Sequence, residues 1–277
     1  MRVHARRLAP AVLLGLAVLA PSRPLAAQPL EADVDEALTL SGVRQTLERL
    51  PRHLQAELRR RQAQLAPADF SALTRIVART YLPATAIAGV RAAFASPESA
   101  DRLPAVLETL RAPLIRRLAL VEVRAPVVES REEIHGFSLD LKRRPPAPGR
   151  LALLERRDAI VGGAALAIEV AVAMDRAVLE LRNWRRPAEH RLRPDDIQAR
   201  LAAAREQYRR AMRDGQMTAA LFAYRAVADA DLERYVAALE SEPDRWFMQG
   251  VRARLVTELA DASDRASAEI LRIFGPR

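Results

Sequence analysis

The sequence predicts an all-α fold, and three observations carry that prediction. Alanine, leucine and arginine, which favour helices, dominate the composition, whereas aromatic residues make up only 4%. Apolar residues recur every three or four positions, which is the period of an amphipathic helix. The 18 prolines divide the 277 residues into many helices. We therefore expect a multi-helix array built from two similar antiparallel helical halves around a central apolar helix.

Residues 1–27 predict a cleaved signal peptide. Three arginines precede the apolar stretch Ala11–Ala20, which is too short to span a bilayer as a stable anchor. Small residues then fit a cleavage site near Ala27 and Gln28. This pattern predicts a periplasmic or secreted protein. An N-terminal anchor or a buried helix is the alternative interpretation of the same stretch.

Charge and cysteine content exclude several classes of site. The chain contains no cysteine, so disulfides, thiolate nucleophiles and thiolate metal sites are excluded. The formal net charge is +9, and removing the signal peptide, with four arginines and no acid, leaves +5. Acids are interspersed with the arginines, whereas a nucleic-acid surface needs a concentrated basic patch with aromatics. We expect a solvated surface of mixed charge, no nucleic-acid partner and no cofactor.

The first predicted half covers residues 28–142. Asp33 or Asp35 is expected to cap its leading helix, whose apolar stripe runs from Leu40 to Leu58. A kink or break is expected at Pro51, because proline removes one backbone donor. The following helices are expected to begin where proline fits a first turn. Those starts are Pro67, Pro83, Ser96-Pro97 and Pro113.

Residues 143–149, RRPPAPG, predict a proline-rich linker between the halves. The second half, residues 150–277, is expected to pack with the first as one unit. It contains a helix from Pro194 to a stop at Asp214-Gly215. The final long helix is expected to begin at Ser241-Glu242-Pro243, where serine caps and proline fits the first turn.

The segment Ala159–Met174 is apolar almost all the way round, so we expect it at the centre of the fold. It belongs to a helix that we expect to run without interruption from Arg150 to about Arg182. Gly163, Ala167 and Ala171 recur every fourth residue, which indicates a face where neighbouring backbones approach closely. At about 24 Å the segment is shorter than a bilayer core. No transmembrane anchor is therefore expected after signal cleavage.

The order of elements repeats between the two halves. Leu103–Leu118 and Leu232–Val251 share a short helix, a proline and a longer amphipathic run, although chance similarity of helical segments is the alternative. With the Arg150–Asp158 entry to the central helix, these stretches resemble exported proteobacterial proteins that carry a helical domain of unknown function. The resemblance implies a fold and a compartment, and it implies no activity.

Two sets of residues are candidates for chemistry. Glu132 and His135 have the Glu-x-x-His spacing that forms half of a carboxylate-bridged di-iron site, but no second pair exists. Solvated charges at a helix end are the alternative interpretation. Glu169 is the only charge inside the central apolar segment, so it must reach water or pair with a cation. It is our candidate for anchoring a ligand, with a structural ion pair as the alternative.

The sequence contains no catalytic motif, so we carry three hypotheses for function. The first is a non-catalytic interaction or envelope-associated protein with an unknown protein partner in the cell envelope. The second is a helical binding module for a lipid or another apolar ligand, which requires a cavity beside the central helix. An enzyme using Glu169 or the Glu132 and His135 pair ranks last. Peripheral contact with a membrane through arginine-rich helices is a further alternative.

Overall fold

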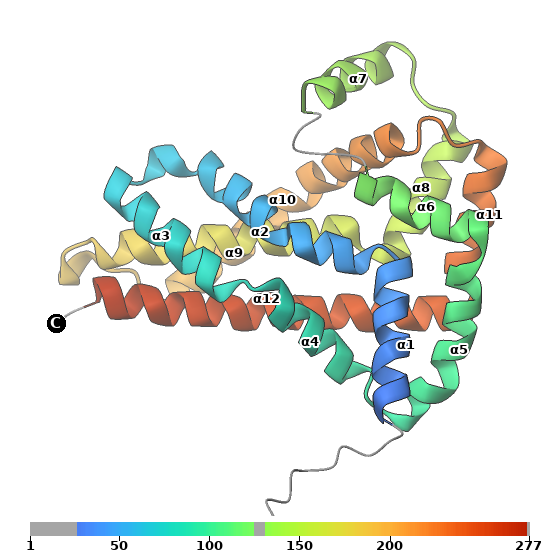
Figure 1. Cartoon of the computed structure of the whole chain (residues 1–277). Coiled ribbons are helices and arrows are strands. Elements are labelled where there is room, and N and C mark those ends of the chain that lie inside the picture. Colours follow the sequence, from blue (N-terminus) through green and yellow to red (C-terminus); the bar gives the residue numbers. More distant parts are fainter. Residues whose placement is uncertain (1–26, 125–130, 276–277) are drawn as a thin grey trace, which may run out of the picture.

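The computed structural model describes residues 27–124 and 131–275, and every regular element within these ranges is helical (Figure 1). The prediction of an all-α protein is confirmed. Residues 1–26, which hold most of the predicted signal peptide, lie outside the described residues. Among the described residues, no helix is both long and apolar enough to cross a membrane.

The helices before residue 125 are α1 (Ala27–Leu40), α2 (Val43–Arg60), α3 (Pro67–Thr80), α4 (Pro83–Ala93), α5 (Pro97–Arg111) and α6 (Pro113–Arg124). Those after residue 130 are α7 (Arg131–Arg143), α8 (Pro148–Val161), α9 (Gly163–Trp184), α10 (Pro194–Ala223), α11 (Asp229–Leu239) and α12 (Glu242–Phe274). Short 3₁₀ turns follow α2 and α9 at Gln62–Gln64 and Ala188–His190.

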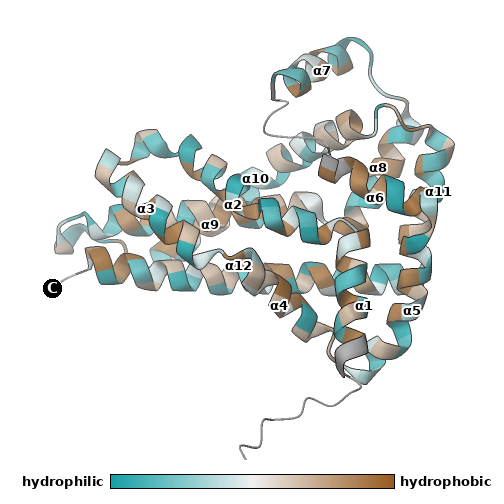
Figure 2. Ribbon diagram, in the orientation of Figure 1, coloured by the Kyte–Doolittle hydropathy of each residue, from teal (hydrophilic) through white to brown (hydrophobic). Residues whose placement is uncertain are grey.

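Helices α9 and α12 pack lengthwise against each other, and the long helix α10 packs along α9 (Figure 1). Helices α1, α5 and α11 stand across one end of α12, α3 lies toward the other end, and α2 runs between α1 and α3 (Figure 1). Most helices carry both hydrophobic and hydrophilic residues along their length, as Figure 2 shows for α12. This amphipathic pattern is what places apolar side chains between the helices.

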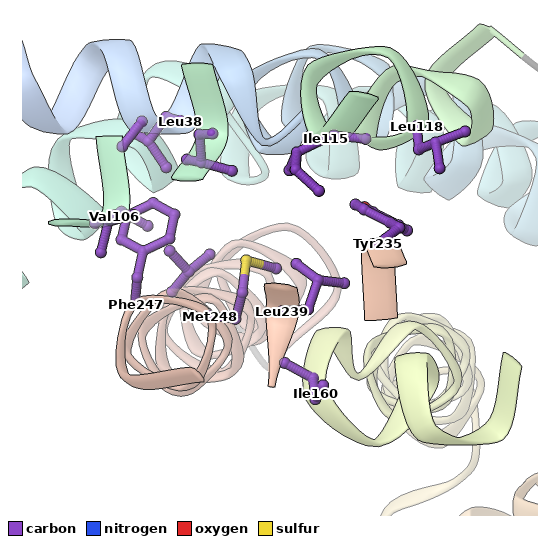
Figure 3. Packing of buried hydrophobic residues seen from close by; sticks show 14 of the residues in the cluster. Leu38, Val106, Ile115, Leu118, Ile160, Tyr235, Leu239, Phe247 and Met248 are labelled. Atoms are coloured by element: carbon purple, nitrogen blue, oxygen red, sulfur yellow. The ribbon is translucent and has the colours of Figure 1, made fainter. Parts of the chain in front are cut away.

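The main hydrophobic core joins residues from both sides of the linker. Figure 3 shows side chains of α1, α5, α6, α8, α11 and α12 pointing into one space, including Leu38, Leu118, Tyr235 and Phe247. A second core joins α2 and α3 with α9 and α12 around Leu54, Met174 and other buried side chains. Because both cores contain residues from before and after the linker, neither part of the chain buries its apolar residues by itself.

Helix starts follow the sequence signals closely. Proline lies in the first turn of α3, α4, α5, α10 and α12, and α6 begins at Pro113, as expected. The Ser96 Oγ accepts the backbone N–H of Ser99 at 3.3 Å, and Ser241 Oγ accepts that of Asp244 at the same distance. These caps satisfy donors that have no partner inside the helix.

Two expectations for the first half, a break at Pro51 and an aspartate cap on the leading helix, are wrong. No break occurs at Pro51, which lies inside the continuous helix α2 between the buried Leu47 and Leu54. Burial on both sides of the proline outweighs the one backbone hydrogen bond that it removes. The expected cap at Asp33 or Asp35 is absent because α1 already begins at Ala27. The carboxylate of Asp35 instead pairs with Arg44 and Arg91.

The expected uninterrupted helix from Arg150 to Arg182 is also wrong. It breaks at Gly162, which has a φ of +73° and separates α8 from α9. An alanine Cβ at this position would overlap with Cδ of Arg252 on α12. Glycine is the residue that adopts this left-handed conformation without a side-chain clash. The apolar segment Ala159–Met174 is therefore divided between the end of α8 and the first half of α9.

The expected stop at Asp214-Gly215 does not occur either, because α10 continues to Ala223. Gly215 has ordinary helical geometry within α10. A helical glycine costs only about 1 kcal/mol relative to alanine, and burial of Leu221 and Phe222 in the next turns outweighs this cost. The bend expected at Pro126 lies outside the described residues.

Candidate functional site

A cavity of about 1160 Å³ lies beside the start of α9. Its wall is formed mainly by α2, α8, α9, α10 and α12, with contributions from the helices around them. Ligand pockets in proteins usually measure about 300–1000 Å³. The volume is therefore sufficient for a small organic ligand with a long aliphatic chain.

Much of the cavity wall is aliphatic. Leu166 and Val170 of α9, Met217 of α10, and Leu255 and Leu259 of α12 all line it. Such a surface binds the apolar part of a ligand by removing it from water, at about 25 cal/mol per Å² of buried area.

The line of small residues on α9 faces this cavity. Gly163 and Ala167 lie in its wall, whereas Ala171 is fully buried beyond it. The expectation of close backbone packing along the whole line is therefore wrong for its first half. The short side chains leave space that no neighbouring helix fills, and this space forms part of the cavity.

Arginines outnumber acids around the cavity. Seven arginines and four acidic side chains line it. Glu57 is neutralised by Arg60 and Arg61, and Glu258 by Arg254. Asp158 accepts the backbone N–H of Ala164 at 3.2 Å. The cavity therefore has a positive electrostatic balance as well as an aliphatic wall.

A cluster of buried and partly buried polar groups holds α2 against α9 and α10 beside the cavity. Arg61 of α2's C-terminal end donates to Asp175 Oδ1 of α9 at 2.6 Å and to Tyr208 Oη of α10 at 3.1 Å. Tyr208 in turn donates to Asp175 Oδ2 at 2.7 Å. Burial and the neighbouring Asp175 carboxylate raise the pKa of Tyr208. This cluster fixes the separation of the helices that bound the cavity.

A hydrogen bond between two uncharged side chains, Tyr81 and Ser263, lies in another part of the cavity wall. The Oη atom of Tyr81 and the Oγ atom of Ser263 are 2.8 Å apart, and Tyr81 lines the cavity. Burial raises the pKa of Tyr81 to about 12. The phenol therefore stays protonated at physiological pH and contributes a polar but uncharged group.

Glu169, the candidate from the sequence, lies on α9 outside the cavity lining. Its carboxylate accepts two hydrogen bonds from Arg205 of α10, at 2.9 and 2.8 Å. The two side chains are 27% and 40% exposed. This geometry joins α9 to α10 through a partly exposed ion pair, so the carboxylate reaches both a cation and water.

Glu132 and His135 lie on α7, and both residues are exposed. Within residues 27–124 and 131–275, no group of three His, Cys, Asp or Glu side chains is placed to hold a metal ion. The metal site suggested by the spacing of Glu132 and His135 therefore stays a hypothesis that rests on sequence alone.

The sequence interpretation missed the arginines that line the cavity. Arg52 of α2, Arg213 of α10 and Arg252 of α12 come from three separate parts of the chain. One signal was present: Arg213 and Arg252 have no acid three or four positions away on their helices, so they lack an intrahelical partner. Only the fold shows that these arginines share one cavity.

Comparison with known proteins identified no relative of this chain. A scan against family models, a search of curated proteins and a search of solved structures each found no match. The class that the structure defines is an all-helical protein with a large cavity between α2, α8, α9, α10 and α12.

Proposed function

We propose that this protein is a non-catalytic helical binding module that holds an apolar ligand, such as a lipid, in the cavity beside α9. The observation that carries the proposal is the aliphatic cavity of about 1160 Å³. Tight packing around the apolar segment of α9 would have contradicted this function. Leu166, Ala167 and Val170 of α9 instead border open space.

The physical basis is the removal of apolar surface from water. A ligand chain that enters the cavity exchanges contact with water for contact with aliphatic side chains, which is the main favourable term in such binding. The Arg61 and Asp175 cluster links α2 to α9 and α10 without the ligand, so the site is largely formed before the ligand binds. Preorganisation of this kind reduces the entropic cost of association.

We also propose that the protein acts in the periplasm or outside the cell, which the signal-peptide pattern of residues 1–27 supports. Interaction with a protein partner of the cell envelope, peripheral membrane contact and likeness to exported proteobacterial helical proteins stay predictions from the sequence. A ligand-binding role is compatible with each of them.

We infer that the fold derives from two similar halves. Support comes from Gly42 and Gly162, the two residues with positive φ among those that the structure describes. Gly42 joins α1 to α2, and Gly162 joins α8 to α9, near the start of each proposed half. In both halves a 3₁₀ turn follows the second helix of the pair.

Binding of cetyl alcohol, a neutral amphiphile with one aliphatic chain, tests the proposed function. Equilibrium dialysis of the radiolabelled alcohol against the purified protein is expected to give saturable binding. The variant Ala167→Phe places an aromatic ring in the cavity and is expected to weaken binding about tenfold or more.

The matched control is Ala165→Phe, which adds the same ring to an exposed position of the same helix outside the cavity lining. This variant is expected to bind cetyl alcohol like the wild type. Absence of saturable binding, or equal loss in both variants, would contradict an apolar site in this cavity.

A further inference from the structure

The cavity wall combines its aliphatic surface with arginines that lack acidic partners. Arg52, Arg213 and Arg252 line the cavity and form no ion pair within the described parts of the chain. Arg252 donates to the backbone carbonyl of Ala159 at 3.2 Å, which leaves its positive charge uncompensated. Three guanidinium groups from three helices therefore give the cavity charge without a protein counter-ion.

Two of these arginines lie on the stretches of α2 and α10 that line the cavity. Arg61 at the end of α2 contacts Tyr208 of α10. Both helices line the cavity near this contact. The lining residues include His53 and Arg60 of α2 and Met212 and Gln216 of α10. Arg52 and Arg213 lie on these two stretches and are exposed to solvent. Both side chains therefore border the cavity and also reach solvent.

We propose that the cavity selects a fatty acid, with the aliphatic chain inside and the carboxylate held by Arg52 and Arg213. This inference rests on the proposed function, because it assigns the head group of the ligand bound there. A guanidinium group presents a planar fork of N–H donors that matches a carboxylate, and the resulting charge-assisted hydrogen bonds are stronger than neutral ones.

Two acids of the cavity wall are already paired with arginines of the protein. Glu57 is engaged by Arg60 and Arg61, so it does not compete for Arg52 or Arg213. Glu258, deeper on α12, is paired with Arg254. A cationic head group would meet repulsion from the arginines, and a neutral one would gain no ion pair.

The experiment compares three amphiphiles with the same aliphatic chain: palmitate, cetyl alcohol and cetyltrimethylammonium. Each is dialysed against the full chain below its micelle concentration, at a pH where palmitate is ionised. Palmitate is expected to bind about tenfold more tightly than cetyl alcohol, and cetyltrimethylammonium more weakly than either. Added salt is expected to weaken palmitate binding and to leave cetyl alcohol binding unchanged.

The double variant Arg52→Gln/Arg213→Gln is expected to lower palmitate affinity about tenfold while cetyl alcohol affinity stays the same. The control Arg59→Gln/Arg210→Gln removes the same net charge from exposed positions of the same two helices outside the cavity lining. It is expected to leave both affinities at the wild-type value, and circular dichroism confirms that each variant folds.

The two proposals fail in different ways. Equal affinity for palmitate and cetyl alcohol, or an equal loss of palmitate affinity in the control, would overturn the assignment of a carboxylate and leave the apolar site intact. If neither amphiphile binds, both the apolar site and its head-group assignment are overturned.

Discussion

The side chain of Arg61 is joined to Asp175 by a 2.6 Å hydrogen bond that connects α2 with the middle of α9. Arg61 is only 6% exposed, and all five of its guanidinium N–H donors find acceptors. The acceptors are on Glu57, Ala171, Asp175 and Tyr208. A buried charge that is satisfied in this way is compatible with a stable fold, but removing one partner leaves the others uncompensated.

Replacing Arg61 is therefore expected to be strongly destabilising. The variant Arg61→Met should lower the free energy of unfolding by about 3 kcal/mol, because Asp175 loses its buried cation. Urea denaturation followed by far-ultraviolet circular dichroism measures this change. The control Arg60→Met removes a neighbouring arginine that is 56% exposed and pairs with Glu57, so a loss below about 1 kcal/mol is expected. Equal losses would show that the Arg61 cluster does not stabilise the fold.

The break between α8 and α9 should depend on glycine. Gly162→Ala is expected to lower the free energy of unfolding by about 1–2 kcal/mol or more, because alanine disfavours positive φ and its Cβ would displace Arg252. Gly215→Ala lies in an open position of α10, where an added Cβ meets nothing within 4 Å. It should instead raise the free energy of unfolding by about 0.5–1 kcal/mol. Thermal unfolding followed by circular dichroism measures both variants. A stabilising effect of Gly162→Ala would contradict the left-handed geometry of this residue.

Glu169→Gln separates a structural role from a ligand-anchoring role. Because Glu169 pairs with Arg205 at a partly exposed site, the variant is expected to lose less than about 1 kcal/mol of stability. Its affinity for cetyl alcohol and palmitate should equal that of the wild type, since Glu169 does not line the cavity. A large loss of palmitate affinity with a normal unfolding curve would instead place Glu169 at the ligand.

Asp244, near the start of α12, should make stability depend on pH in an unusual direction. Burial raises the pKa of its carboxyl above the ordinary value of 3.8. The native state then binds the proton more tightly than the unfolded state, so stability falls as the pH rises from about 3.8 through the raised pKa. Asp244→Asn removes this ionisation. We expect its stability relative to the wild type to be higher at neutral pH than at pH values below 3.8.

The pKa of Asp231 is shifted in the opposite direction to that of Asp244, so urea denaturation at neutral and at acid pH should give the opposite result for its variant. Hydrogen bonds from Arg234 and Arg117 lower the pKa of Asp231. Its contribution to stability is therefore present above pH 3.8 and is lost as the pH falls through the lowered value. Asp231→Asn should be less stable than the wild type at neutral pH, and the difference should disappear in acid. If both variants showed the same sign of pH dependence, the burial argument for Asp244 would fail.

Local signals were sufficient for most helix starts. Ser96 and Ser241 cap α5 and α12 because a serine side chain and a proline in the first turn act within four residues. Local signals could not predict whether a glycine or an interior proline ends a helix. Gly162 ends a helix, Gly215 does not, and Pro51 lies within α2, because packing against other helices decides each case.

The sequence allowed an apolar cavity beside the central helix to be predicted, but it did not show which charged residues line that cavity. The hypothesis of an apolar ligand required a cavity beside the central helix, and Gly163 and Ala167 of α9 line such a cavity, although their spacing had indicated close packing. Glu169 stood out in the sequence as a charge among apolar residues, yet it faces Arg205. Arg52 and Arg213 resemble many other arginines in the chain. Their common position depends on how α2 and α10 approach each other.

The sequence by itself determined that the chain is helical, where most helices begin and which faces are apolar, because these properties arise from contacts within a few residues. The tertiary structure alone decided where the helices leave space and which charges border it. Those features depend on residues more than a hundred positions apart, such as Arg61 and Asp175, whose contact follows from the packing of α2 on α9. A periodic pattern specifies the face that a helix buries, and it does not specify the helix that covers that face.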